Sequence, residues 1–461
     1  MYFVARNQYY ALAIPFGLFF ILLYFFALDK LMWLLVFFTP LAVSIKDSDF
    51  GLGVSLPTEP LMAGILVLFI IKLFFDWSFD KRFLKHPLTL AIAFNLIWMT
   101  ITTFTSELPI VSLKYLVSRL WFVVPFYFLL SKLIKNPADI RKFAWMYIIP
   151  LIIVVIYTTI HHATYGFDVK AGNWVMSPFY NDHTAYGMIL AFFTPISISL
   201  LITSEYSRSV KAYAFIAMSI IMFGLFLSYS RAAWLSLVAG LGVMVLIYFK
   251  IKLRYILISF ITVVALFFSF ENQILDTLSK NKQDSSKNFM QHITSSSNIA
   301  TDASNLERIN RWACALRLFE ERPVTGWGPG TYQFVYAPMQ RAKEKTIIST
   351  DFGDGGNAHS EYLGPLAEMG VLGSLSFIII AIIILSTGIR VYKRIENPSD
   401  KHMVMGILIA FVTYFIHGLM NNFLDTDKAS VPFWGFAAIL VLLDIQYFPK
   451  SEDTTQKKIT R

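Results

Sequence analysis

Cationic and imidazole side chains at the ends of long apolar segments are the residues of this 461-residue sequence best suited to chemistry. Arg231 lies between two apolar runs, in Ser-Tyr-Ser-Arg-Ala-Ala-Trp-Leu. A charge at that position is costly unless it is paired or faces water. Its planar guanidinium could hold a phosphate or diphosphate group. The alternative is a snorkelling anchor at a membrane boundary.

His359 precedes an apolar run that begins near residue 365. Asn357 is predicted to cap the helix formed by that run, which would place His359 in the first turn. The positive end of a helix disfavours a protonated imidazole, so a neutral His359 could take a proton from a sugar hydroxyl. The alternative is that His359 has no catalytic role, because its position in the sequence alone says little about chemistry.

The segment 305–322 is predicted to form an amphipathic helix that ends at Pro323. Its apolar residues recur at helical spacing and are Ile309, Trp312, Leu316 and Phe319. Three arginines fall within about 60° of one another beside this stripe: Arg308, Arg311 and Arg322. Arg308 and Arg311 could form a second cationic clamp, or could simply pair with Glu307 or Glu320 at the surface. Asp182 and His183 form another polar cluster, which could also only cap a helix.

Two acidic triplets are the candidates for a metal site. Asp47-Ser48-Asp49 and Asp425-Thr426-Asp427 both fall in connections between apolar runs. Paired carboxylates can hold Mg²⁺ or Mn²⁺ for a diphosphate substrate, but short acidic residues are also common in solvated turns. We expect the second case, and therefore no metal and no cofactor.

Composition identifies the elements that must position these residues. Hydrophobic residues make up 56% of the chain and charged residues only 15%, against about 25% charged in soluble proteins. This excludes soluble enzymes, nucleic-acid binders and secreted disulfide scaffolds, and the single cysteine also excludes a thiolate metal cluster. The sequence predicts an all-α polytopic membrane protein, because the apolar runs are long and show no period-2 alternation.

Thirteen apolar segments reach or approach the length of about 20 residues that crosses a bilayer. We expect about twelve true spans (12–13), with both termini in the cytoplasm, because the first two segments are separated only by Asp29-Lys30. No N-terminal signal peptide is expected. The segments are 9–28, 31–45, 57–75, 88–105, 113–131, 143–162, 185–203, 212–229, 232–249, 254–270, 365–387, 403–424 and 431–447.

Lysine and arginine predict the orientation. Alternate connections carry 20 of them on one side and 5 on the other, so the first set is predicted to be cytoplasmic. The net charge of +9 then reflects the Lys and Arg of the cytoplasmic connections and does not indicate a nucleic-acid partner. The richer connections are 76–87, 132–142, 204–211, 250–254, 388–402 and the tail from 448; the poorer ones are 46–56, 106–114, 163–184, 230–231 and 425–430.

The long segment between the late spans carries ten Lys and Arg and ten Asp and Glu, so it is predicted to lie outside. Its part 281–304 is rich in Ser and Asn and is expected to be flexible. The predicted organisation is a transmembrane bundle over 1–270, an extracytoplasmic loop domain with amphipathic helices over 271–360, C-terminal transmembrane helices over 361–447, and a cytoplasmic tail over 448–461.

The C-terminal half, over about 225–375, resembles the O-antigen ligase and polymerase superfamily of bacterial envelope proteins. Each motif is weak by itself, but their order and spacing together are specific. The motifs are Arg231 with Leu235 (Arg-X3-Leu), Arg308 with Trp312 (Arg-X3-Trp), the turn Arg322-Pro-Val-Thr-Gly-Trp-Gly-Pro-Gly330, and His359 with Gly370 (His-X10-Gly).

The resemblance implies a GT-C-like glycosyltransferase in the bacterial cytoplasmic (inner) membrane, with its site facing the periplasm. The donor would be a glycan on undecaprenyl diphosphate, and the acceptor the lipid A core or another glycan. His359 would act as base or orienting group, with inversion at C1. Arg231 and Arg308 would hold the diphosphate, with Arg311 as the alternative to Arg308. Asn357, Asp182 and His183 are expected at the substrate-binding surface.

Three other functions compete with an O-antigen ligase. A polymerase of the same superfamily would use the same donor at the same boundary. A flippase for polyprenyl-linked glycans should show internal repeats and charges near the midplane, and here Arg119 is the main mid-span charge. A metal-dependent transferase would use Asp47 or Asp425.

Overall fold

The computed structural model describes residues 22–24, 26–47, 52–73, 79–249, 303–345, 349 and 356–447. These residues are mostly helical, and a π-helical segment, Val124–Leu129, joins α7 to α8. The helices are α3 (Leu28–Phe38), α4 (Thr58–Leu73), α5 (Lys81–Leu84), α6 (Pro87–Phe104), α7 (Pro109–Val123), α8 (Leu130–Leu133), α9 (Pro137–Ala163), α10 (His183–Leu201), α11 (Arg208–Leu227), α12 (Arg231–Tyr248), α16 (Ala303–Glu321), α17 (Tyr332–Val335), α18 (Leu363–Arg394), α19 (Pro398–His417) and α20 (Asp427–Tyr447).

The chain is an all-α polytopic membrane protein, as predicted. Within the described residues, eight segments are long and apolar enough to cross a membrane, and α12 is a shorter apolar helix. The eight lie close to predicted spans. The predicted span 254–270 and most of the segments 281–304 and 9–28 lie outside the described residues. The eight segments are Pro87–Phe104, Pro109–Leu133, Pro137–Ala163, His183–Leu201, Arg208–Leu227, Leu363–Arg394, Pro398–His417 and Asp427–Gln446.

The predicted span 31–45 is wrong in its second half. Helix α3 ends at Phe38, a 3-10 turn follows over Thr39–Leu41, and the chain then enters a strand. Pro40 cannot donate a backbone hydrogen bond, and its ring opposes continuation of the helix. Strands β1 (Val43–Asp47) and β2 (Leu52–Leu56) form an antiparallel pair, with Val43 opposite Leu56. This hairpin covers the predicted connection 46–56 and the last three residues of the predicted span.

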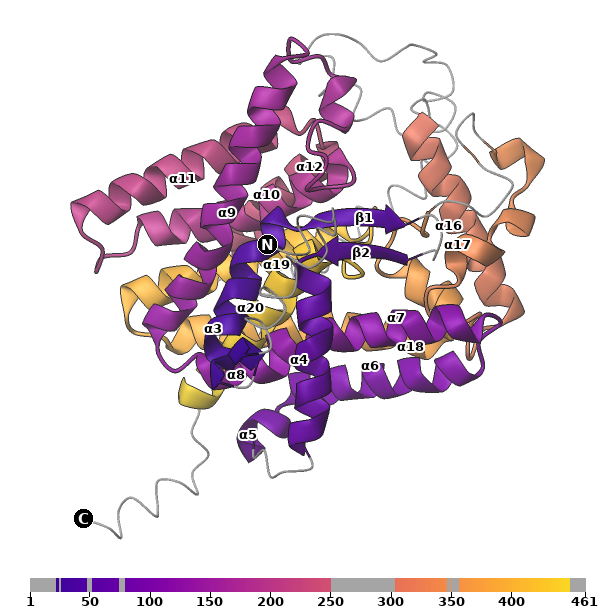
Figure 1. Ribbon diagram of the computed structural model, residues 1–461, viewed down its shortest axis with the longest axis horizontal. Helices are drawn as coiled ribbons and strands as arrows, with labels where there is room; N and C mark the ends of the chain where they lie inside the picture. Colours follow the sequence, from indigo (N-terminus) through magenta and orange to yellow (C-terminus); the bar gives the residue numbers. More distant parts are fainter. Residues whose placement is uncertain are drawn as a thin grey trace, which may run out of the picture.

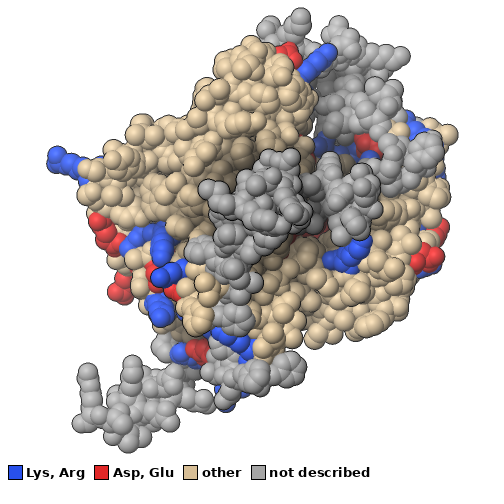
Figure 2. Space-filling view, in the orientation of Figure 1, with Lys and Arg blue, Asp and Glu red and all other residues tan. Residues whose placement is uncertain are grey.

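Two groups of helices pack around a shared centre. Helices α6, α7 and α18 lie side by side, and α16 and α17 stand across one end of them (Figure 1). Helices α9 to α12 form the second group, while α19 and α20 lie between the two. Most of the described surface in Figure 2 carries neither acidic nor basic side chains. Exposed apolar residues on α6 and α9 include Leu90, Ile97, Ile153 and Ile160, as expected of helices that face lipid.

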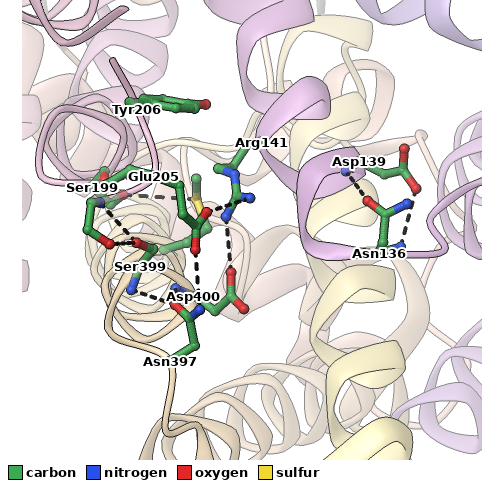
Figure 3. A network of polar contacts seen from close by, with 12 residues as sticks. Asn136, Asp139, Arg141, Ser199, Glu205, Tyr206, Asn397, Ser399 and Asp400 are labelled. Atoms are coloured by element: carbon green, nitrogen blue, oxygen red, sulfur yellow. Dashed lines mark hydrogen bonds and ion pairs between the residues drawn. The ribbon is translucent and has the colours of Figure 1, made fainter. Parts of the chain in front are cut away.

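Three connections predicted to be cytoplasmic meet at one end of the bundle. Arg141, at the start of α9, forms ion pairs with Glu205 at 2.8 Å and with Asp400 at 3.1 Å (Figure 3). Ser204 and Ser399 exchange a hydrogen bond of 2.8 Å beside these pairs. The connections 132–142, 204–211 and 388–402 therefore share one end, as the charge pattern predicts. Which side of the cell this end faces stays a prediction.

Replacing Arg141 tests this polar network. Arg141→Ala removes the guanidinium from the mostly buried carboxylate of Asp400, and an unsatisfied buried acceptor costs about 1–3 kcal/mol. We expect a lower midpoint temperature of unfolding in detergent. Arg82→Ala is the control, because Arg82 and Asp80 form an exposed pair two residues apart, and such pairs contribute about 0–1 kcal/mol. Equal midpoints for the two variants would contradict this account.

Candidate active site

A break in α18 anchors the outer segments to the bundle. Gly370 interrupts the helix with φ 67° and ψ −166°. The carbonyl oxygens of Ala367 and Glu368 accept hydrogen bonds from Trp327 N at 3.1 Å and Gly328 N at 2.8 Å. On the far side of the break, Val371 N donates to Pro323 O at 3.0 Å. The turn that follows α16 is thereby bonded to α18.

Glycines are required on both sides of this contact. The backbone angles of Gly370 lie in a region that is essentially restricted to glycine. A Cβ at Gly370 would overlap the carbonyl oxygen of Val324, and a Cβ at Gly326 would overlap the backbone of Glu368. The glycines of two predicted motifs, His-X10-Gly and the 322–330 turn, therefore belong to one backbone-to-backbone contact.

His359 lies in the segment before α18 and not in its first turn. The prediction that Asn357 caps this helix is wrong, because α18 begins at Leu363. Asn357 Oδ1 instead accepts a hydrogen bond from His359 N at 3.0 Å, which forms a tight local turn. His359 has φ 49°, an uncommon backbone conformation for a residue other than glycine. Ser360 Oγ accepts from Leu363 N at 3.3 Å and so covers the helix start.

Helix α16 forms over Ala303–Glu321, as predicted, but its buried face differs from the predicted one. Ile309 and Leu316 of the apolar stripe are 43% and 45% exposed. The buried face is made of Glu307, Asn310, Arg311, Cys314, Ala315 and Leu318. Its polar members are paired within the protein, and this pairing offsets the cost of burying them. Hydrophobic spacing alone gives no information on such pairs.

Arg311 supports the His359 segment from α16. It is buried and forms an ion pair with Glu307 at 2.9 Å. Its Nη1 donates to Asn357 O at 3.2 Å, and its guanidinium lies 5.0 Å from the ring centre of Tyr336. A Cβ at Gly356 would overlap this guanidinium. Arg311 is therefore committed to protein contacts, whereas Arg308 is partly exposed.

Arg308 connects α16 to the segment 418–426 between α19 and α20. Its Nε donates to Met420 O at 3.3 Å. Glu361 holds the same segment from the His359 side: its Oε1 accepts from Phe423 N at 2.7 Å and Leu424 N at 3.0 Å, and also from the Tyr414 hydroxyl. Glu361 N donates to Gly418 O at 2.8 Å. The segment 418–426 thus fixes Arg308 relative to the His359 backbone.

The surroundings of His359 favour its neutral form. The pKa of His359 is lowered to about 4, chiefly by burial and also by the charges of Arg311 and Arg308, while Asp182 and Glu307 oppose the shift. These groups come from α16 and from the start of α10, so Arg308, Asp182 and His359 gather at one place. Above about pH 5 the imidazole is unprotonated and can accept a proton.

The remaining predicted residues lie at helix starts. Asp182 caps α10, with its Oδ1 accepting from Thr184 N at 2.7 Å and Ala185 N at 2.9 Å, and His183 is the first residue of that helix. Arg231 is the first residue of α12. A Cβ at Gly187 in α10 would lie 2.6 Å from Ser230 Cβ. Arg231 therefore starts α12 beside the early turns of the helix that Asp182 caps.

A cavity of about 470 Å³ is lined in part by the 356–361 segment. Arg231, Arg308 and His359 are not among the residues that line it. Its wall includes Lys114 and Arg119 from α7. Carboxylates line it as well: Glu59, Glu361, Glu368 and Asp425. Desolvation raises the pKa of Asp425 to about 6, with Glu361 adding to the shift and Arg119 opposing it.

Most of this wall is not predicted from the sequence. Glu361 and Glu368 belong to none of the predicted sites, and Asp425 is predicted to be an ordinary loop residue. Arg119 is predicted only as a mid-span charge. That charge was the available signal, because an ionisable residue inside a membrane helix usually faces a cavity.

The acidic triplets have structural contacts. Asp47 ends β1, and Asp49 lies outside the described residues. Asp427 accepts a hydrogen bond from Thr58 Oγ1 at 2.6 Å and pairs with Lys428 at 3.6 Å. Across the described ranges, His, Cys, Asp and Glu side chains form no group of three placed to hold a metal ion.

Comparison with known families agrees with the motifs. Residues 213–378 match the model of the O-antigen ligase family, which supports the assignment of this chain to the O-antigen ligase superfamily. The matched range covers α12, α16, the glycine turn, His359 and the break at Gly370. A comparison with curated protein sequences finds no significant match.

Gly370→Ala tests the helix break. The substituted residue would have to adopt a left-handed backbone and displace the Val324 carbonyl, at an expected cost of about 3 kcal/mol or more. We expect a clear loss of thermal stability in detergent. Gly242→Ala is the matched control: Gly242 lies inside α12 with open space around it, and alanine favours a helix over glycine by about 1 kcal/mol. Equal stability of both variants would contradict this account.

Proposed function

We propose that this protein transfers a glycan from a polyprenyl diphosphate to an acceptor hydroxyl, in the manner of an O-antigen ligase. The observation that carries the proposal is a neutral imidazole beside a partly exposed arginine. His359 is held by α16 and by the 356–361 turn, and Arg308 lies close enough to lower its pKa. The match of residues 213–378 to the O-antigen ligase family supports the choice of donor.

In the proposed reaction His359 acts as the general base. The acceptor oxygen forms a bond to C1 of the donor sugar as its proton passes to the imidazole. The bond between C1 and the diphosphate oxygen breaks on the opposite face, so the configuration inverts. Such a base contributes about 10²- to 10⁴-fold in rate. A general base must be unprotonated before it reacts, and the lowered pKa of His359 meets this requirement at neutral pH.

Arg308 and Arg231 would stabilise the diphosphate as it leaves. Negative charge grows on the bridging oxygen during bond cleavage, and fixed cations in a partly dry site offset it. Arg308 is held by the Met420 carbonyl, and Arg231 begins α12 near the start of α10. His183, the first residue of α10, would contact the same headgroup or its sugar. No divalent ion is required by this proposal.

Ligase and polymerase chemistry differ only in the acceptor. We place ligation first: the acceptor is then the lipid A core at the outer face of the cytoplasmic membrane. A flippase is the further alternative. Transfer by purified protein in detergent, where no sealed bilayer exists, distinguishes a transferase from a flippase.

Replacing His359 tests the base. The purified protein is supplied with undecaprenyl-diphosphate-linked glycan and rough lipopolysaccharide in the presence of EDTA. We expect His359→Gln to lower the transfer rate by about 10²- to 10⁴-fold. His402→Gln is the control, because His402 is exposed at the opposite end, at the start of α19, and should keep full activity. Full activity of His359→Gln would refute the assignment, and loss of activity on chelation with recovery in Mg²⁺ would refute metal independence.

The pH profile is a separate test. The pKa of His359 is lowered to about 4, so the base stays unprotonated as the pH falls from 7.5 to 5.5. We therefore expect kcat/KM, which reports the free enzyme, to change little over that range and to fall only below about pH 5. If His359 had an ordinary pKa of about 6.5, half of it would be protonated at about pH 6.5, and kcat/KM would already be halved there. A midpoint near 6.5 would contradict the proposed environment of His359.

A further inference from the structure

The cavity lined by the 356–361 segment has the composition of a saccharide site. Its volume of about 470 Å³ lies within the range usual for ligand pockets. Lys114, Ser118 and Arg119 line it from α7, and Glu368 and Asp425 line it from α18 and the 418–426 segment. Sugar hydroxyls both donate and accept hydrogen bonds. A wall with cationic donors on one helix and carboxylate acceptors on the others matches that pattern.

Arg119 is the strongest single indication of a ligand. It lies in a membrane-spanning helix, where a charge is retained chiefly for a function. Its Nη2 donates to the Tyr115 hydroxyl at 2.8 Å, and the guanidinium lies 5.5 Å from that ring centre. Among the described residues no carboxylate lies within ion-pair distance of it. A guanidinium carries five N–H donors, so most remain available to a molecule in the cavity.

Aromatic rings complete the wall. Trp and Tyr rings offer an apolar face and a polar edge, which suits a sugar ring with its C–H faces and peripheral hydroxyls. Phe334 is 49% exposed, so the apolar part of the wall is reachable. The aromatic lining residues are Tyr115, Trp121, Tyr332, Phe334 and Trp434.

The position of the cavity relative to His359 identifies which substrate it would take. Asn357, Ala358, Ser360 and Glu361 line the cavity, whereas His359 itself does not, and its carbonyl oxygen accepts a hydrogen bond from Trp312 Nε1 at 3.3 Å. The cavity therefore lies next to the segment that carries the candidate base. A transferase needs a second substrate site next to its base. The proposed function already assigns the donor diphosphate to Arg308 and Arg231, so the cavity remains for the acceptor.

We propose that this cavity binds the saccharide of the acceptor, with Arg119 and Asp425 as its principal polar contacts. The inference rests on the proposed transferase function and adds a place for the second substrate. Two acceptors present the same kind of ligand, a hydroxyl-rich saccharide: a lipopolysaccharide core and a second lipid-linked repeat.

Steady-state kinetics test the site. Arg119→Met and Asp425→Asn are assayed in detergent with donor at saturation, once with rough lipopolysaccharide and once with undecaprenyl-diphosphate-linked repeat as acceptor. We expect KM for the effective acceptor to rise at least tenfold, kcat at saturation to stay within about threefold, and KM for the donor to be unchanged. Arg119→Lys should restore part of the affinity. Arg208→Met, at the exposed start of α11, is the control and should leave both constants unchanged.

Direct binding separates this inference from the proposed function. In the His359→Gln background, which blocks turnover, rough lipopolysaccharide and the lipid-linked repeat are titrated against protein with and without Arg119→Met. Loss of binding with that substitution supports the site, even if no variant shows transfer. Active transfer with an unchanged acceptor KM in Arg119→Met and Asp425→Asn, or a rise in donor KM alone, overturns it. Ser118→Phe, which fills the cavity, gives a second check: unchanged acceptor binding overturns the site.

Discussion

The contact between the glycine turn and the broken helix α18 is the constraint on which the outer half of the structure depends. A continuous helix would use the carbonyls of Ala367 and Glu368 internally. The break at Gly370 frees these groups for the turn that follows α16. Because this contact is made by backbone atoms at close approach, it fixes the end of α16 against the bundle. The arginines of α16 and the segment before α18 are then positioned by the same pair of elements.

A second set of contacts controls the chemistry of His359. Arg311 and Glu361 hold the 356–361 segment from opposite sides, one from α16 and the other through the 418–426 connection. Both side chains serve to position the segment, and each has several hydrogen-bond partners, as the burial of such polar groups requires. The imidazole between them experiences burial and two nearby guanidinium groups, and it stays neutral for that reason. The 356–361 segment thereby carries His359 and also forms part of the wall of the mixed-charge cavity.

Much of the fold was predictable because membrane helices carry their signal locally. Helices α6, α10 to α12 and α20 begin and end within four residues of the predicted apolar runs, whereas α9 begins six residues earlier and α18 ends seven residues later than predicted. The charge pattern correctly grouped the connections that meet at Arg141. The failures occurred where local and tertiary effects compete. Asn357 has the residue type of a helix cap but bonds to His359 instead. Ile309 and Leu316 have core spacing but lie on the exposed side of α16.

By itself, the sequence determined the all-helical membrane class, the approximate spans, and the motifs that relate the chain to the O-antigen ligases. These properties depend on the apolar content and spacing of contiguous residues. Tertiary structure alone decided that Arg311 is buried while Arg308 is partly exposed. It also brought Arg119 and Asp425 to one cavity wall. The physical reason is that a polar side chain in a bundle acquires its role from partners on other helices, here residues separated by up to about 300 positions. Such pairings follow from how the helices pack, and the composition of a single helix does not contain them.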